Sequence, residues 1–177
     1  MPAAQGKGSA NMSYAIVYSS RTGNTAHLAE AIREALPKEE CVYFGKADDA
    51  ALKADRLYIG FWTDKGTCDA DTEAFLESVQ GKEVFLFGTA GFGRDAAYFD
   101  QVLGRVKMNL KADNRIVGTY MCQGRMPRSV RERYEKMRES TVHIPNLEEL
   151  IENFDQALAH PNDGDLARLR QAVLENP

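Results

Sequence analysis

The chain has 177 residues, of which 44% are hydrophobic and 27% are charged, the balance of an ordinary globular domain with a substantial core. Its 22 basic and 26 acidic residues give a net charge of −4, which excludes the basic footprint of a nucleic-acid-binding protein. No apolar run approaches membrane-spanning length. We therefore expect the protein to bind neither nucleic acid nor membrane.

Residues 1–11 are small and polar and lack the apolar core of a signal peptide. We interpret them as a disordered leader or a tag remnant in front of a single domain at 12–177. The three cysteines, Cys41, Cys68 and Cys122, lie far apart and form neither a CxxC pair nor a zinc-ligand cluster. Free thiols are typical of a reducing compartment, so a cytoplasmic location is expected.

Short apolar runs alternate with amphipathic ones through the first 122 residues. Five of these runs have the composition of strands that are buried on both faces: Tyr14–Tyr18, Cys41–Phe44, Leu57–Phe61, Val84–Phe87 and Ile116–Met121. Apolar residues recur at helical spacing after Thr25, after the possible cap Asp69, and around Val102. The crossover at Gly45–Arg56 is short and has room for one helical turn.

Strands that alternate with helices predict right-handed βαβ units. The expected fold class is therefore α/β, with a doubly wound, five-stranded parallel sheet covered on both faces. Residues 123–177 are predicted to form a helical C-terminal extension with two or three helices. The expected helices are a polar surface helix at Ser129–Ser140 with Glu132 paired to Lys136, an apolar stripe at Leu147–Leu158, and a last helix after the turn at His160–Gly164.

A polar loop follows the first strand and opens the first helix: Ser19, Ser20, Arg21, Thr22, Gly23, Asn24 and Thr25. A helix N-terminus presents unpaired backbone N–H groups, and its dipole favours negative charge. The hydroxyl groups add donors, and glycine allows a left-handed backbone or close approach of a ligand. The loop has neither the GK[ST] of a Walker A motif nor a GxGxxG pattern. It is predicted to hold a phosphate; the alternative is a polar turn with a good helix cap.

The pattern Ser20-x-Thr22-Gly23-x-Thr25 after a first strand resembles the FMN phosphate loop of flavodoxins. The segment from Gly60 to Gly93, with FWTDKGT and FGTAGFG after the third and fourth strands, resembles a divergent flavodoxin subfamily. This resemblance covers residues 12–122. It implies the strand order 2-1-3-4-5 and FMN as the cofactor, held where the loops after strands one, three and four converge.

On this basis three loops are expected to bind FMN. Their residues are Ser19, Ser20, Arg21, Thr22, Gly23, Asn24, Thr25, Phe61, Trp62, Thr63, Asp64, Lys65, Gly66, Thr89, Ala90, Gly91, Phe92 and Gly93. Trp62, the only tryptophan, is predicted to stack on the flavin, with Phe92 or Tyr98 on the opposite loop. Lys65 either stabilises the reduced, anionic flavin or points to solvent. No catalytic or metal-ligating residues are predicted.

The leading interpretation is an FMN-binding electron-transfer protein that passes electrons between a reductase and an acceptor, because no acid–base constellation accompanies the loops. One alternative is an FMN-dependent oxidoreductase whose extension helps to bind a quinone, an aromatic or a tetrapyrrole substrate. A second alternative is a non-redox module that binds a phosphorylated ligand or a protein. We expect the chain to be an electron carrier and not a self-contained enzyme. It is expected to be a monomer or a homodimer.

Overall fold

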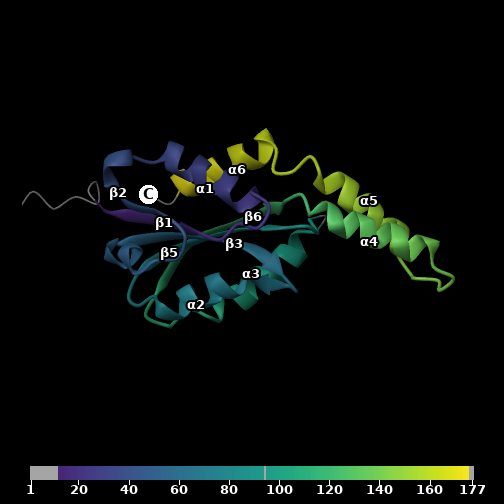
Figure 1. Cartoon of the computed structure of the whole chain (residues 1–177). Helices are drawn as coiled ribbons and strands as arrows, with labels where there is room; N and C mark the ends of the chain where they lie inside the picture. Colours follow the sequence, from purple (N-terminus) through teal and green to yellow (C-terminus); the bar gives the residue numbers. More distant parts are fainter. Residues whose placement is uncertain (1–11, 94, 176–177) are drawn as a thin grey trace, which may run out of the picture.

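The computed structural model describes residues 12–93 and 95–175; the predicted leader at 1–11 lies outside this part. A central sheet has helices on both faces, and two further helices project from one end (Figure 1). The strands are β1 (Tyr14–Tyr18), β2 (Cys41–Gly45), β3 (Arg56–Asp64), β4 (Thr67–Cys68), β5 (Glu83–Ala90) and β6 (Arg115–Gln123). The helices are α1 (Asn24–Ala35), η2 (Lys38–Glu40), η3 (Asp49–Lys53), α2 (Ala70–Ser78), α3 (Ala96–Lys107), α4 (Arg128–Glu139), α5 (Leu147–Ala157) and α6 (Asp163–Leu174).

The sheet confirms the predicted architecture. Its main strands are all parallel and follow the order β2-β1-β3-β5-β6, which is the expected 2-1-3-4-5 once the short β4 is set aside. β4 is absent from the predicted elements and pairs antiparallel with the end of β3. Within the described residues, no helix has the length and apolar character needed to cross a bilayer.

Helices cover the two faces of the sheet in pairs. α1 and α6 lie on one face, while α2 and α3 lie on the other (Figure 1). Leu166 and Leu169 of α6 pack in the same buried cluster as Leu28 and Ile32 of α1. The segment predicted as a helical extension therefore contains two different parts, because α6 closes the α/β core while α4 and α5 leave it.

Two glycine–phenylalanine pairs join β3 to β5 at the centre of the sheet. Gly60 lies opposite Phe87, and Phe61 lies opposite Gly88. A Cβ atom on Gly60 would stand 2.3 Å from carbons of the Phe87 ring, and one on Gly88 would stand 2.3 Å from Cζ of Phe61. Each ring thus covers the backbone of the facing glycine, and the two fully buried rings belong to the cores on opposite faces.

We call the projecting hairpin of α4 and α5 the arm (residues 128–157; Figure 1). The arm has a small core of its own, in which Tyr134 of α4 meets Leu147, Ile151 and Phe154 of α5. The predicted polar surface helix therefore buries one side. The expected pair of Glu132 with Lys136 is replaced by a pair with Arg128, at 3.7 Å.

A polar cluster holds the start of α6. Oδ2 of Asp165 lies 2.6 Å from Nδ1 of His160, and Oδ1 accepts a 2.7 Å hydrogen bond from Arg168. Asn162 and Asp165 form a capping box, and the Tyr120 hydroxyl donates to the backbone oxygen of Asp165 at 2.7 Å. Burial raises the pKa of Asp165, but the hydrogen bonds from Asn162, His160 and Arg168 outweigh it and leave that pKa below its ordinary value.

Asp165→Asn is expected to lower the free energy of unfolding at neutral pH by about 1.5–3 kcal/mol, the scale of hydrogen bonds to a charged group. Because the pKa of the folded state is depressed, this stability is present above the ordinary pKa of 3.8 and is lost as the pH falls through the lower folded value. Urea unfolding of both proteins at about pH 7 and about pH 3 measures the effect. The difference should shrink at the lower pH, and a difference that does not change would contradict the ionic role of Asp165.

Candidate functional site

The carboxyl ends of β1, β3 and β5 meet at one edge of the sheet, where their loops enclose a cavity of about 250 Å³ that we call the loop cavity. The predicted residues that line it are Ser20, Arg21, Thr22, Asn24, Thr25, Trp62, Thr63, Asp64, Lys65, Gly66, Thr89, Ala90, Gly91 and Phe92, together with the alternative aromatic residue Tyr98. The structure thus brings together side chains from three loops that lie far apart in the sequence. Their contact with a cofactor stays a prediction.

Four predicted residues lie outside the cavity lining. Ser19 lines a neighbouring groove, Gly93 lines a cleft beside α5, and Gly23 is the N-cap residue of α1. Phe61 is fully buried, because successive side chains on a strand point to opposite faces and Trp62 takes the cavity side.

The segment between β6 and α4 completes the lining, and the sequence-based site lacks it. Its residues in the cavity are Gly124, Arg125, Met126, Pro127 and Val130. The sequence does contain a signal for these residues. In a parallel sheet the carboxyl end of the last strand lies at the same edge as the phosphate loop, so the segment that follows this strand is expected near the site. A Cβ on Gly124 would stand 2.5 Å from Nδ2 of Asn24, so this position requires glycine for the close approach of the two segments.

The loop before α1 has the geometry of an anion site. Gly23 has a φ of 88°, in the left-handed region where glycine is favoured. Oγ of Ser20 accepts hydrogen bonds from the N–H groups of Gly23, at 3.1 Å, and Ala26, at 3.3 Å. The N–H groups of Asn24 and Thr25 at the helix start find no acceptor in the described part of the chain. Two free N–H groups at the positive end of a helix dipole fit a phosphate.

The Thr25 hydroxyl, predicted as a phosphate donor, has another role. It is fully buried, donates to the backbone oxygen of Phe61 at 3.1 Å, and lies 3.2 Å from the Thr89 hydroxyl. These contacts connect the start of α1 to β3 and β5. The side chain of Thr25 therefore fixes the position of the loop, while its backbone N–H has no acceptor in the described part of the chain.

The side chains of Thr22 and Asn24 hold the segment after β6. Both donate to the backbone oxygen of Arg125, Thr22 at 3.3 Å and Asn24 at 2.7 Å. The side-chain oxygen of Asn24 is buried and has no hydrogen-bond donor among the described residues.

Aromatic side chains flank the cavity on two loops. Trp62 is half-buried, and the guanidinium carbon of Arg21 lies 5.5 Å from the centre of its ring. Phe92 is 42% exposed and meets Tyr98 edge-on, with ring centres 6.4 Å apart. Because neither ring is fully buried, both offer an accessible apolar surface to a flat ligand.

Positive charge predominates around the loop cavity. Arg21, Lys65 and Arg125 line it, with Asp64 as the one carboxylate among the described lining residues. Lys65 is exposed at the tip of the β3–β4 hairpin, where it and Gly66 have φ values of 51° and 84°, as a two-residue type I′ turn requires. This setting favours anionic ligands.

α5 is bound to the loop after β5 through buried amides. The backbone oxygen of Gly91 accepts hydrogen bonds from Nε2 of Gln123, at 2.9 Å, and Nδ2 of Asn153, at 3.0 Å. The side chains of Gln123 and Asn153 also bind each other at 3.1 Å. The arm is therefore braced directly against one wall of the cavity.

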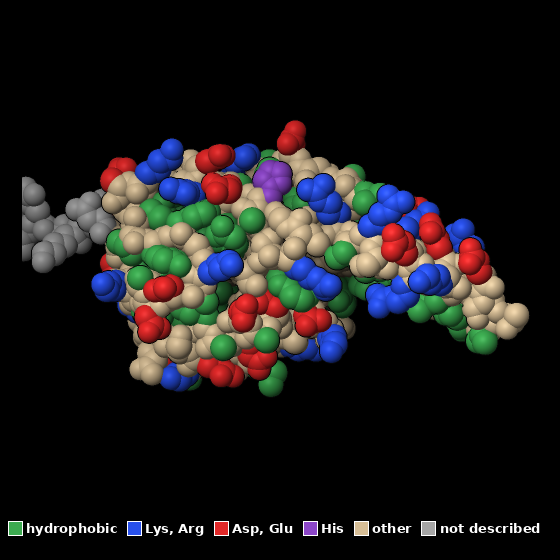
Figure 2. Space-filling view, in the orientation of Figure 1, with side chains coloured by type: hydrophobic (Ala, Val, Ile, Leu, Met, Phe, Trp, Pro, Cys, Tyr) green, Lys and Arg blue, Asp and Glu red, His purple; other side chains and the backbone are tan. Residues whose placement is uncertain are grey.

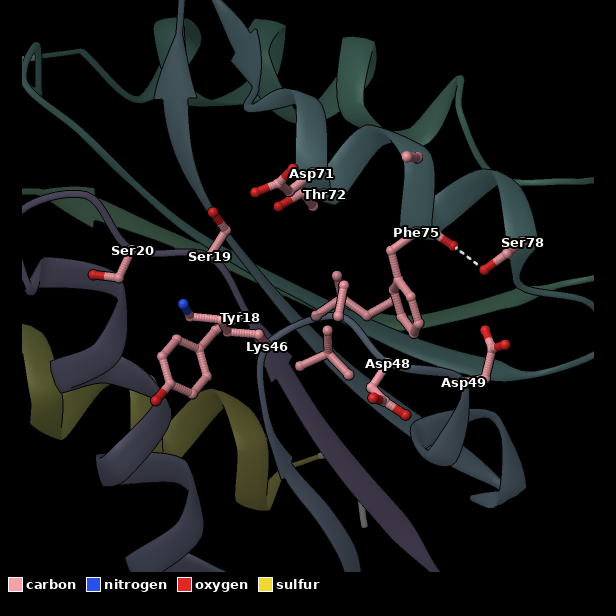
Figure 3. A pocket seen from close by; sticks show the side chains of 14 residues that line it. Tyr18, Ser19, Ser20, Lys46, Asp48, Asp49, Asp71, Thr72, Phe75 and Ser78 are labelled. Atoms are coloured by element: carbon pink, nitrogen blue, oxygen red, sulfur yellow. Dashed lines mark hydrogen bonds between the residues drawn. The ribbon is translucent and has the colours of Figure 1, made fainter.

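A larger groove of about 690 Å³ lies beside the phosphate loop, between α2 and η3 (Figure 3). It exists because η3 has five residues and covers less of the sheet than a full crossover helix. Its polar lining includes Lys46 and the carboxylates of Asp48, Asp49 and Asp71. Since three carboxylates repel a phosphate, we assign the anion site to the loop cavity and not to this larger groove.

The cysteines supply no second chemistry. All three are free, and burial raises the pKa of Cys68 to about 11 and that of Cys122 to about 12. Neither thiol is ionised at neutral pH, so neither is an activated nucleophile. The described residues also contain no cluster of His, Cys, Asp and Glu that would hold a metal ion.

An anion site at the first helix and aromatic walls on two further loops, at the switch point of a 2-1-3-4-5 sheet, define a flavodoxin-like protein. Residues 15–174 match the family model described as a flavodoxin domain, and the chain belongs to that family.

Two curated relatives span almost the same length. The flavodoxin-like domain-containing protein BilS of Clostridium symbiosum (strain WAL-14163) is 38% identical over 183 residues, covering 93% of this chain and 96% of the relative. BilS of Clostridioides difficile (strain CD3) is 27% identical over 158 residues, covering 85% and 88%. A short-chain flavodoxin associated with a non-canonical PDU bacterial microcompartment has a TM-score of 0.59 at 16% identity, over 93% of this chain and 96% of that one, which shows the shared fold.

Proposed function

We propose that this protein binds FMN in the loop cavity and transfers electrons between redox partners. The observation that carries the proposal is the pair of free N–H groups at Asn24 and Thr25, on the same cavity as the aromatic rings of Trp62 and Phe92. A phosphate and a flat apolar ring at opposite ends of one ligand are what this arrangement recognises. Membership of the flavodoxin domain family supports a flavin as that ligand.

Each part of the ligand has a partner in the chain. The backbone N–H groups of Asn24 and Thr25 would hold the phosphate, and the Asn24 side chain, which lines the cavity, would lie beside the ribityl chain. The side chains of Trp62 and Phe92 would bind the flavin ring. Bound FMN supplies the redox chemistry, and the protein supplies binding and orientation. The described lining holds one carboxylate, Asp64, and no histidine, which favours a carrier over an enzyme with its own acid–base pair.

An absorbance titration of the purified protein with FMN, FAD and riboflavin tests the proposal. We expect saturable FMN binding, with quenching of the flavin and tryptophan emission. The loaded protein is then photoreduced without oxygen, with EDTA as the electron donor, and mixed with a heme acceptor. Reoxidation of the flavin in step with reduction of the heme supports electron transfer. Absence of binding by every flavin would remove the function and leave only the fold.

Trp62→Ala is expected to weaken FMN binding by roughly 1–3 kcal/mol, the scale of a lost aromatic contact with its buried area. Trp62→Phe serves as the matched control, because it keeps an aromatic face at the same place on β3. Fluorescence titration of the three proteins measures the affinities. If the alanine variant binds FMN as tightly as the parent protein, Trp62 does not contact the flavin.

An FMN-dependent oxidoreductase is a second candidate, and one observation favours it. A cleft of about 290 Å³ beside α5 shares Phe92 and Tyr98 with the loop cavity, so a small substrate in it would lie next to the flavin. An oxidoreductase of this kind would oxidise NAD(P)H or a substrate without help, whereas a carrier needs a reductase. Steady-state NAD(P)H oxidation by the FMN-loaded protein separates the two. The free cysteines agree with a cytoplasmic setting for either function.

A further inference from the structure

The most basic segment of the chain begins at the loop cavity and follows the arm. Residues 125–138 contain six basic and two acidic side chains, in a chain whose net charge is −4. Figure 2 shows Lys and Arg side chains gathered along the projecting arm, with Asp and Glu between them. This positive excess belongs to the segment that leads into and follows α4, because the acidic residues of α5 leave the whole arm, 128–157, with five basic and seven acidic side chains.

Half of these cations are paired within the arm. The pairs are Arg128 with Glu132 at 3.7 Å, Arg131 with Asp155 at 3.3 Å, and Arg138 with Glu148 at 3.1 Å. Arg125, Arg133 and Lys136 are exposed and form no ion pair in the described part of the chain. Their charges are therefore available to another molecule.

The unpaired cations lie where a partner would reach the cavity. Arg133 and Lys136 are three residues apart on α4 and share one side of the helix. Val130 and Tyr134 turn to the other side, where they pack against α5. Val130 and Arg125 also line the loop cavity, so the base of α4 forms part of the cavity mouth. A surface that rests on the exposed side of α4 is thereby brought next to the cavity.

We propose that Arg125, Arg133 and Lys136 form a docking surface for a protein partner with an acidic contact face, which exchanges electrons with the flavin. This inference rests on the proposed function. Charge complementarity steers encounter and fixes orientation. Because the net charge of this protein is −4, most of its surface would repel an acidic partner. Attraction to the basic segment would therefore orient the two molecules so that the loop cavity faces the partner. Nucleic acid is disfavoured because acidic side chains interrupt the basic row along the arm.

The test compares two variants with the same change in net charge. Arg133→Glu/Lys136→Glu reverses the charge of two exposed cations of α4, while Lys38→Glu/Lys53→Glu reverses two exposed lysines that precede β2 and β3, at the opposite edge of the sheet. None of the four residues lines the loop cavity, so FMN affinity should be unchanged in both variants. The probes are an acidic heme protein, cytochrome b5, a basic one, cytochrome c, and a short DNA duplex.

Calorimetric titration at low ionic strength measures binding, and stopped-flow absorbance measures electron transfer from the reduced, FMN-loaded protein. We expect cytochrome b5 to bind more tightly than cytochrome c and to weaken as salt is added. The arm variant should lose at least roughly tenfold in affinity and rate for cytochrome b5, while the control variant loses much less. Equal losses in both variants, tighter binding of cytochrome c, or tighter binding of DNA would overturn the docking surface. Failure to bind FMN would instead refute the proposed function, because binding of cytochrome b5 is measured without the flavin.

Discussion

Phe87→Ala is expected to lower the free energy of unfolding by about 3–5 kcal/mol, the range for removing a large ring from a closed core. Phe87 is fully buried in the centre of the sheet, and its ring lies on the backbone of Gly60. The deletion therefore leaves a cavity against the backbone of Gly60, which has no side chain to fill it. Urea unfolding followed by circular dichroism measures the loss.

A double-mutant cycle with Gly60→Ala tests the reason for this loss. In the parent protein the new methyl group would stand 2.3 Å from the Phe87 ring, and such overpacking costs about 1–3 kcal/mol. In the Phe87→Ala background the same methyl group enters the vacated space and costs much less. Gly104→Ala is the matched control, since a Cβ there meets nothing within 4 Å and helix propensity alone favours alanine. Additive effects of Gly60→Ala and Phe87→Ala would contradict the pairing of ring and glycine.

FMN is expected to bind at least about 100-fold more tightly than riboflavin, which lacks the phosphate. Two N–H groups at the start of α1, those of Asn24 and Thr25, have no acceptor in the described residues, and a hydrogen bond to a charged group contributes about 1.5–3 kcal/mol. Together they supply roughly 3–6 kcal/mol, before any contribution from the helix dipole. Parallel fluorescence titrations give the ratio, and equal affinities would place the phosphate outside this loop.

A substitution at Gly23 is expected to affect the binding of the phosphate group and not that of the flavin ring. Its φ of 88° is costly for other residues, yet a Cβ atom there meets nothing within 4 Å, so a substitution changes only the backbone. Gly23→Val should weaken FMN binding by roughly 1–3 kcal/mol and leave riboflavin binding unchanged. Gly23→Asn is the control, because asparagine tolerates the left-handed region. A similar loss for riboflavin would show that the variant damages the whole cavity.

The strands of the sheet are predictable because a strand that is buried on both faces has a continuous run of apolar residues in the sequence. β1 has the predicted bounds, Tyr14–Tyr18, and Asp69 caps α2 as expected, accepting a bond from the N–H of Thr72. The ends of the strands are harder to predict, since polar residues continue the pairing after the apolar run stops. β3 therefore extends to Asp64 and enters the hairpin that carries Lys65.

The site is predictable as far as the loops that end the strands, and less so in its side chains. Strand alternation sends Phe61 into the core and Trp62 to the cavity, a distinction that requires the register and not only the motif. The contribution of Met126 and Val130 depends on where α4 leaves the sheet. That direction is set by contacts between distant segments, such as the bonds to the backbone oxygen of Arg125, which no local pattern encodes.

The separate core of the arm affects how the molecule fluctuates. Its four buried side chains, Tyr134, Leu147, Ile151 and Phe154, are not part of either sheet core, so the arm can unfold locally while the sheet stays intact. Its amide protons then exchange with solvent at a lower free-energy cost than those of β3 and β5. Because Asn153 of α5 holds the backbone oxygen of Gly91, each such opening also loosens one cavity wall. The rate at which a ligand enters or leaves is thereby tied to the stability of the arm.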